Sequence, residues 1–304
     1  MDKNVCECCS SSHITSLGQY CGYAHFACED CRFEYFVQEG TGTSCNLYET
    51  DRDYLDDLSV SGNYHDLLQW QHLIALKFIK QNKNRAPVIL DVGCFNGFFV
   101  KKLSDMGYEA HGIDFNRTAV EYGISEYGLE NRIAVKDLNE LIAEKRKYDI
   151  ITAFDVIEHI ENPRQLLLRL KDLLPEGGIL ILSAPNNNML WRPILDYPPH
   201  HLSRYYPRTL ARFVSTSEFT IVNQFEQMNV FNLIRNFIGA LFRDKKSKSL
   251  RGGRLRKQRW VNIVRTSLNR TRRFFYVFSY PVDRLLYLFG LRYIGQVIIC
   301  ERVK

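Results

Sequence analysis

Residues 89–97, with the sequence ILDVGCFNG, constrain the fold of this chain more than any other segment. The mostly apolar run Val88–Val92 is followed directly by glycine, as is typical of a buried parallel strand. Gly93 and Gly97 permit a tight turn and a close approach of the backbone to a ligand. A helix predicted over residues 98–106 would present free N–H groups behind this turn. The segment therefore predicts a strand, a glycine loop and a helix that together hold a ligand.

Strand-like and helix-like segments alternate through residues 86–230. Repeated β-α-β spacing of this kind is typical of a doubly wound parallel sheet, so the fold class is predicted as α/β and Rossmann-like. In such a sheet, ligands bind at the carboxyl ends of the strands, where the strand order reverses. We predict helices over residues 118–127 and 163–174, and strands over residues 110–113, 132–135, 148–154, 179–183, 219–225 and 297–300.

Asp114 ends the second predicted strand, 17 residues after Gly97. In dinucleotide-binding folds, a carboxylate at this place accepts hydrogen bonds from the ribose hydroxyls. The G-x-G-x-x-G pattern of a nicotinamide site is absent from the glycine loop. From the residues alone, a strand, turn and helix that bind no ligand remain an alternative interpretation.

The glycine loop and the segments after it resemble class I methyltransferases that use S-adenosylmethionine (SAM). The first motif of that family is D/E-x-G-x-G-x-G, and Phe95 stands where its middle glycine is usual. Because phenylalanine does not readily take a positive φ, we expect the loop path to differ there. The resemblance continues through residues 148–159 (YDIITAFDVIEH), 174–178 (LPEGG), 184–186 (APN) and 200–206 (HHLSRYY).

This resemblance implies an activity and a set of cofactor contacts. It is closest to the small-molecule branch, which includes ubiquinone-biosynthesis O-methyltransferases and methyltransferases of polysaccharide gene clusters. The implied reaction is methyl transfer from SAM to a small-molecule acceptor, above all a hydroxyl of a sugar or a lipid-linked glycan precursor. The implied cofactor-binding residues are Asp91, Gly93, Gly97, Asp114, Asp137, Leu138, Phe154 and Asp155.

Candidate catalytic residues follow the fourth and fifth predicted strands. Methyl transfer requires donor and acceptor to be held about 3 Å apart, and often requires removal of a proton from the acceptor. Histidine suits that task near neutral pH, so His159 and His201 are candidate bases, with Glu158 beside them. Structural contacts in caps or loops are the alternative. Asp155, Glu158 and His159 are also a candidate Mg²⁺ or Mn²⁺ site.

Two C-x-x-C pairs, Cys6 with Cys9 and Cys28 with Cys31, are separated by 18 residues. This spacing is typical of a zinc ribbon, in which four thiolates bind a tetrahedral Zn²⁺. So small and polar a region needs the free energy of metal binding to fold. We therefore predict a structural zinc site in a module over residues 1–48, with reduced thiols in a flexible tail as the alternative.

A helical linker is predicted over residues 49–85, where apolar residues recur at helical spacing. Relatives usually place such a helix over SAM. We therefore expect the linker to act as a lid, and we expect Tyr54, Tyr64 and Gln71 to reach the cofactor.

A basic and aromatic insert is predicted over residues 231–290, before a final strand in residues 291–304. Residues 243–273 hold 13 Lys/Arg against one acid, although the whole chain carries only +6. Aromatic and leucine residues beside many cations are typical of a helix in a membrane interface, so contact with an anionic membrane is one interpretation. A cover for the substrate is another, and an RNA-binding arm is a third that the small-acceptor motifs disfavour.

The sequence shows no signal peptide and no long apolar run, so we expect a cytoplasmic protein, with peripheral membrane attachment as the alternative. Three function classes remain. They are a small-molecule methyltransferase, an RNA methyltransferase, and a non-catalytic adaptor with a degenerate SAM fold, which only Phe95 favours.

Overall fold

The computed structural model describes residues 1, 3–39, 68–82, 87–189, 192, 196–227, 281, 282, 285 and 294–303. They belong to two compact units, one of Met1–Asn187, Leu195–Glu226 and Gly295–Lys304, the other of Asn188–Ile194 and Gln227–Ile294. The predicted basic segment 243–273 and the predicted lid residues Tyr54 and Tyr64 lie outside the described residues, and their roles stay predictions. No helix in the described part of the chain is long and apolar enough to cross a membrane.

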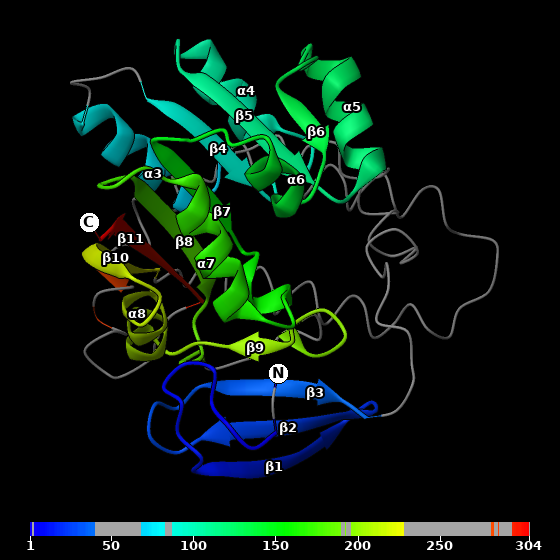
Figure 1. The fold of residues 1–304 in the computed structure, drawn as a ribbon, viewed down its shortest axis with the longest axis vertical. Coiled ribbons are helices and arrows are strands. Elements are labelled where there is room, and N and C mark those ends of the chain that lie inside the picture. Colours follow the sequence, from blue (N-terminus) through cyan, green and yellow to red (C-terminus); the bar gives the residue numbers. More distant parts are fainter. Residues whose placement is uncertain are drawn as a thin grey trace, which may run out of the picture. The chain divides into compact units, whose positions relative to one another are not determined.

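A seven-stranded sheet forms the centre of the first unit (Figure 1). Its strands are β4 (Val88–Val92), β5 (Glu109–Asp114), β6 (Ile133–Val135), β7 (Ile150–Phe154), β8 (Ile179–Pro185), β10 (Phe219–Gln227) and β11 (Gly295–Arg302). The strand order is β10-β11-β8-β7-β4-β5-β6, and β11 runs antiparallel to β8. The pairs β4–β5, β5–β6, β4–β7 and β7–β8 are parallel. The predicted doubly wound α/β sheet is confirmed, and its order reverses between β4 and β7.

Helices accompany the strands in the described part of the chain. They are α3 (Trp70–Gln81), α4 (Phe98–Asp105), α5 (Arg117–Tyr127), α6 (Leu138–Ala143), α7 (Pro163–Leu173) and α8 (Pro207–Ser215), with the short 3-10 helix η1 (Ile157–His159). The Asn116 and Asn162 side chains accept the backbone N–H groups of Ala119 and Gln165, both at 2.9 Å. The sequence analysis predicted α4, α5 and α7 within two residues, but it did not predict α6 or α8.

A second, four-stranded sheet combines the N-terminal residues with a strand from the middle of the chain. β1 (Ile14–Tyr20), β2 (Tyr23–Cys28) and β3 (Glu34–Gln38) pair antiparallel in chain order, and β9 (Ser203–Arg204) pairs antiparallel with β3 (Figure 1). Glu34 lies opposite Arg204 in this ladder. The N-terminal module therefore shares its sheet with the segment between β8 and α8.

The hydrophobic core continues from the seven-stranded sheet into the N-terminal module. Successive residues of β4 point to opposite faces of the sheet, and Ile89 and Leu90 accordingly belong to two different buried clusters. The cluster of Leu90 also contains Phe33, which lies two residues after Cys31. The Phe33 ring lies 5.2 Å from that of Phe213 on α8 and 5.4 Å from that of Tyr205. Apolar burial thus fixes the module against α8.

Candidate functional site

The glycine loop between β4 and α4 turns through three residues with positive φ, which are Gly93 (74°), Phe95 (53°) and Gly97 (71°). Our expectation that phenylalanine would avoid this conformation was wrong. A left-handed backbone costs a non-glycine residue about 1–2 kcal/mol, which the surroundings of Phe95 must offset. Its backbone N–H donates to Asp114 Oδ2 at 2.7 Å, and this charge-assisted bond holds the turn.

Gly93 and Gly97 are closely packed as well as left-handed. A Cβ atom on Gly93 would lie 2.5 Å from Val156 Cγ2, and one on Gly97 would lie 2.8 Å from Leu129 Cδ1. Neither position has room for a side chain. The loop backbone therefore closely approaches the segment that follows β7 and the segment between α5 and β6, as the predicted loop requires.

Asp114 lies at the carboxyl end of β5, next to the loop. Its Oδ2 accepts the N–H of Phe95 and its Oδ1 accepts the N–H of Asn116, each at 2.7 Å. Burial raises the pKa of Asp114, and the backbone hydrogen bonds act in the opposite direction. An ionised carboxylate has about four acceptor positions, so two remain for a ligand hydroxyl pair.

Asp91, one strand away, is almost completely buried, with 3% of its surface exposed. The Thr152 hydroxyl donates to its Oδ1 at 2.6 Å. Burial raises the pKa of Asp91 to about 7, and the nearby Asp114 carboxylate contributes to the rise. Two carboxylates thus lie at the carboxyl ends of adjacent strands, where a ligand with hydroxyl or ammonium donors would be favoured.

Asp137 and Leu138, two of the implied cofactor-binding residues, lie at the start of helix α6. The Asp137 carboxylate accepts the N–H of Glu140 at 2.9 Å, and the Glu140 carboxylate accepts the N–H of Asp137 at 3.0 Å. This reciprocal pair is a capping box. The Asp137 side chain therefore has a structural role, and Leu138 is buried beside it.

Phe154 ends β7, Asp155 follows it, and both contact the helix that precedes the sheet. The Phe154 ring lies 5.0 Å from that of His72 on α3. Asp155 has a φ of 54°, and its carboxylate accepts the Ser183 hydroxyl at 2.8 Å and the Gln71 amide at 3.0 Å. Gln71, one of the three predicted lid residues, therefore reaches the residues that follow β7.

His159 and His201 lie together, with ring centroids 4.7 Å apart. His159 Nδ1 donates to the His200 carbonyl at 2.6 Å, which leaves its Nε2 as the acceptor nitrogen. Burial lowers the pKa of His159 to about 3, and His201 adds to the effect. His159 is therefore neutral at physiological pH.

Glu158 is 1% exposed, and its Oε1 lies 3.9 Å from His159 Nε2. Neither carboxylate oxygen of Glu158 has a hydrogen-bond partner among the described residues. Burial raises its pKa well above the ordinary value, and the Asp155 and Asp196 carboxylates add to the rise. Burial therefore favours the neutral form of this side chain.

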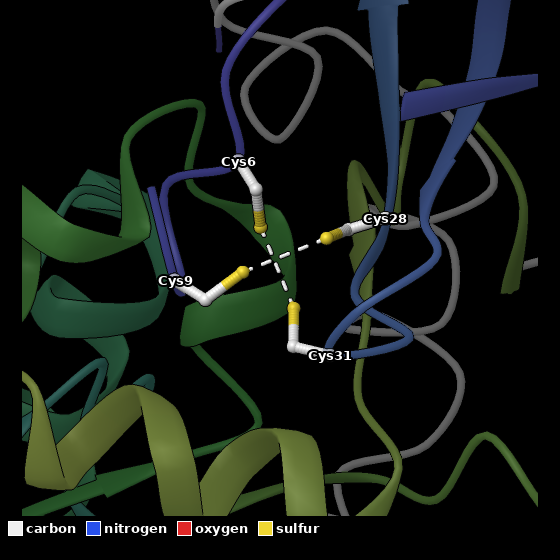
Figure 2. A group of neighbouring side chains, drawn as sticks. All are labelled: Cys6, Cys9, Cys28 and Cys31. Atoms are coloured by element: carbon white, nitrogen blue, oxygen red, sulfur yellow. Dashed lines mark hydrogen bonds between the residues drawn. The ribbon is translucent and has the colours of Figure 1, made fainter. Parts of the chain in front are cut away.

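The four cysteines of the N-terminal module converge on one point (Figure 2). Cys6 Sγ and Cys31 Sγ are 3.4 Å apart, and Cys9 Sγ and Cys28 Sγ are 3.6 Å apart. A tetrahedral Zn²⁺ with Zn–S distances of about 2.3 Å requires sulfur atoms about 3.8 Å apart, so the cluster fits this ion closely. The hydrogen bond with Cys31 and burial raise the pKa of the Cys6 thiol.

The sequence of this chain is similar to those of known methyltransferases. A family profile described as "Methyltransferase domain" matches residues 64–224, which is more than half of the chain. The chain belongs to this methyltransferase family. A ubiquinone biosynthesis O-methyltransferase of Paraburkholderia phytofirmans is 28% identical over 156 residues, and the match covers 48% of this chain and 66% of that relative. The matched part is just under two thirds of the relative's length.

Solved structures support the fold of this methyltransferase domain. Phosphoethanolamine N-methyltransferase 2 of Haemonchus contortus superposes with a TM-score of 0.53 at 14% identity, covering 89% of this chain and 62% of that one. The [4+2]-cyclase SpnF superposes with the same TM-score and identity, covering 84% and 94%. Since one of these proteins is a cyclase, the fold by itself does not decide the reaction.

The predicted Mg²⁺ site of this methyltransferase does not have the expected ligands. The atoms that come within 4.8 Å of one another belong to Glu158, His159 and His201, while the Asp155 carboxylate is bound to Ser183 and Gln71. Two imidazoles with one carboxylate are not the oxygen-rich set that Mg²⁺ prefers. We therefore derive no catalytic step through Mg²⁺.

The sequence analysis missed two residues beside the candidate base of the methyltransferase. Asp196 Oδ1 lies 3.0 Å from His201 Nδ1, and Asp196 Oδ2 lies 3.4 Å from Arg204 Nε. Both side chains are nearly inaccessible, at 2% and 6% exposed. Asp196 and Arg204 stand within five residues of His201 in the sequence, and this proximity could have marked them as candidates. No helical or strand periodicity, however, places their side chains on the same side as His201.

Proposed function

We propose that this methyltransferase transfers the methyl group of SAM to a hydroxyl of a small molecule, with a sugar or a lipid-linked glycan precursor as the acceptor class. The observation that carries the proposal is the left-handed loop closed on Asp114. Two glycines without room for side chains and a carboxylate at the end of β5 suit an adenosyl ligand with a ribose diol. Asp91, Gly93, Gly97 and Asp114 are the residues assigned to the cofactor.

The acceptor is assigned to the side of the cofactor where η1 and the segment before β9 meet. Val156 packs under Gly93, and His159 follows three residues later with His201 beside it, so the two sites adjoin. His201 is the proposed base, because Asp196 binds its Nδ1 and thereby directs Nε2 as the proton acceptor. A carboxylate that orients a histidine in this way is a recurring catalytic arrangement.

The proposed reaction is an in-line displacement. The acceptor oxygen forms a bond to the methyl carbon while the carbon–sulfur bond breaks. The electron pair of the broken carbon–sulfur bond stays on sulfur. The hydroxyl proton passes to His201 Nε2. His159, neutral and fixed on the His200 carbonyl, and Glu158, whose neutral form is favoured by burial, are proposed to orient the acceptor by hydrogen bonds.

Zn²⁺ is the proposed structural ion of the N-terminal module, bound by Cys6, Cys9, Cys28 and Cys31. Four thiolates leave no coordination position for a substrate, so the ion would stabilise the fold and take no part in methyl transfer.

Two measurements on the full chain test the proposed function. Calorimetry should detect SAM and its demethylated product S-adenosylhomocysteine, and absence of binding by either would leave only the adaptor interpretation. Label from methyl-labelled SAM should enter sugars or glycan precursors, and His201→Asn should abolish this transfer while the exposed His13→Asn should not. Label in RNA and in no small molecule would contradict the proposed acceptor class.

A further inference from the structure

Glu34 of β3 is a half-buried carboxylate in the N-terminal module, three residues after Cys31. Its Oε1 accepts the Asn187 amide at 2.7 Å. Its Oε2 lies 3.4 Å from His25 Nε2 and 3.8 Å from Arg204 Nη1. Burial opposes ionisation, but the contacts with His25 and Asn187 outweigh it, and the pKa of Glu34 lies below its usual range. Glu34 is therefore a fixed negative charge.

Arg204 of β9 lies between Glu34 and a second carboxylate, Asp196. Its Nε is 3.4 Å from Asp196 Oδ2, and its Nη2 donates to the Asp196 carbonyl at 2.9 Å. The guanidinium also lies over the rings of Phe36 and Tyr197, at 4.8 and 4.6 Å. A planar guanidinium held by two rings can contact two carboxylates in one fixed geometry, which an ammonium group cannot do.

Asp196 connects Arg204 to the candidate base. While Oδ2 faces the guanidinium, Oδ1 lies 3.0 Å from His201 Nδ1. Glu34, Arg204, Asp196 and His201 thus form a series of contacting side chains. Each of the four is between 2% and 16% exposed. Their ion pairs are consequently little screened by solvent.

Backbone hydrogen bonds join the same two regions. The carbonyl of Leu202, next to His201, accepts the N–H of Phe36 on β3 at 2.8 Å. The N–H of Leu202 donates to the carbonyl of Glu158 at 2.7 Å. One residue, Leu202, therefore connects the N-terminal module to the 3-10 helix that carries Glu158 and His159.

We propose that Glu34 is a positioning residue for His201, acting through Arg204 and Asp196, so that the N-terminal module completes the acceptor site. The functional meaning of this arrangement rests on the role of His201 in the proposed function. Two carboxylates share one guanidinium. If Glu34 loses its charge, Asp196 is the counter-ion of Arg204 that remains among the described ion pairs. Asp196 is then drawn toward Arg204 and binds His201 Nδ1 less strongly. His201 then loses its preference for the Nδ1–H tautomer.

The test is nitrogen NMR of the full chain labelled in the imidazole rings of its eight histidines. His201 is assigned by the signals that disappear in His201→Asn, and spectra are recorded at a pH where the ring is neutral. In the wild type, Nδ1 should show the shift of a protonated nitrogen and Nε2 that of an unprotonated one. In Glu34→Gln, the two shifts should converge toward those of a freely exchanging imidazole.

Glu39→Gln is the matched control, because Glu39 follows the same strand but binds Lys3 at the surface. It should leave the His201 shifts unchanged. Identical His201 shifts in Glu34→Gln and the wild type would overturn the proposal. If Glu34→Gln does not fold, Arg204→Lys decides in the same way, since lysine keeps the charge but cannot contact both carboxylates.

SAM titrated into the same samples separates this proposal from the proposed function. Its affinity should be equal in wild type, Glu34→Gln and Glu39→Gln, because the glycine loop is not touched. Failure of the wild type to bind SAM would refute the proposed function. The nitrogen shifts of His201 would still show whether Glu34 determines its tautomer.

Discussion

Phe95 donates its backbone N–H to the carboxylate of Asp114 across the glycine loop, at 2.7 Å. This bond compensates a residue that lacks the conformational freedom of glycine, and it uses the same carboxylate to which we assign the ribose. Loop shape and ligand binding therefore depend on one side chain. A phenylalanine in the loop is consequently no sign of a degenerate site.

Asp114→Asn should weaken SAM binding about tenfold or more, because charge-assisted hydrogen bonds are worth about 1.5–3 kcal/mol. The amide can still accept from Phe95 or from Asn116, so the fold should persist. Calorimetric titration with SAM measures the loss. Asp105→Asn on the exposed end of α4 is the control, and equal affinities in the two variants would remove Asp114 from the cofactor site.

Gly93→Ala should abolish SAM binding, because the new Cβ would lie 2.5 Å from Val156 Cγ2 at a residue with a φ of 74°. Gly107→Ala isolates the backbone contribution, since that glycine has a φ of 85° and nothing within 4 Å of the added atom. It should lose about 1 kcal/mol of stability and keep SAM affinity. The double variant Gly93→Ala/Val156→Ala should regain part of the binding. Equal behaviour of the two alanine variants would mean that the close packing under Gly93 is unimportant.

Asp91 should make the stability of the ligand-free protein depend on pH. Its folded-state pKa is about 7, against about 3.9 in an unfolded chain, so the folded state holds the proton more tightly. The free energy of unfolding should therefore fall as pH rises from about 4 to about 7, and the contribution of Asp91 should be constant above that. Asp91→Asn, which can still accept from Thr152, should remove this part of the dependence.

Urea unfolding at pH 5 and pH 8 measures the effect. The stability advantage of Asp91→Asn over the wild type should be larger at pH 8, by on the order of 2–4 kcal/mol for a shift of this size. Asp105→Asn should show no such pH-dependent advantage. The same difference between Asp91→Asn and the wild type at both pH values would show that Asp91 is ionised in the folded protein throughout this range.

Strong periodic segments made much of the fold predictable. β4, β5, β7 and β8 are apolar runs bounded by turns, and local patterns of that kind determine strands without reference to distant residues. Helix α6 was missed because the Asp137-Leu138 pair was interpreted as a ligand contact, although Asp137 and Glu140 have the spacing of a capping box. The four cysteines were predictable because C-x-x-C spacing is itself a geometric constraint.

The connection between Glu34 and Arg204 was not predictable, for a different physical reason. β9 has two residues, too few for any period, and its partner strand lies some 170 residues earlier in the chain. Tertiary packing of Phe33 against Phe213 creates this pair, and no local propensity specifies it. The conformation of Phe95 was likewise determined by a distant carboxylate.

Removal of zinc should therefore affect more than the N-terminal module. Cys28→Ser should lower the zinc content of the purified protein from one equivalent to near zero, since three thiolates bind the ion far less tightly than four. β3 begins six residues after Cys28, and it supports β9 and the Leu202 peptide. For Cys28→Ser we expect a lower melting temperature and loss of methyl transfer, with SAM affinity retained.

Cys21→Ser, at an exposed cysteine outside the cluster, is the control and should change none of these quantities. Wild-type protein that contains no zinc, or a Cys28→Ser variant that melts and turns over like the Cys21→Ser control, would refute a structural metal site whose effect extends to His201.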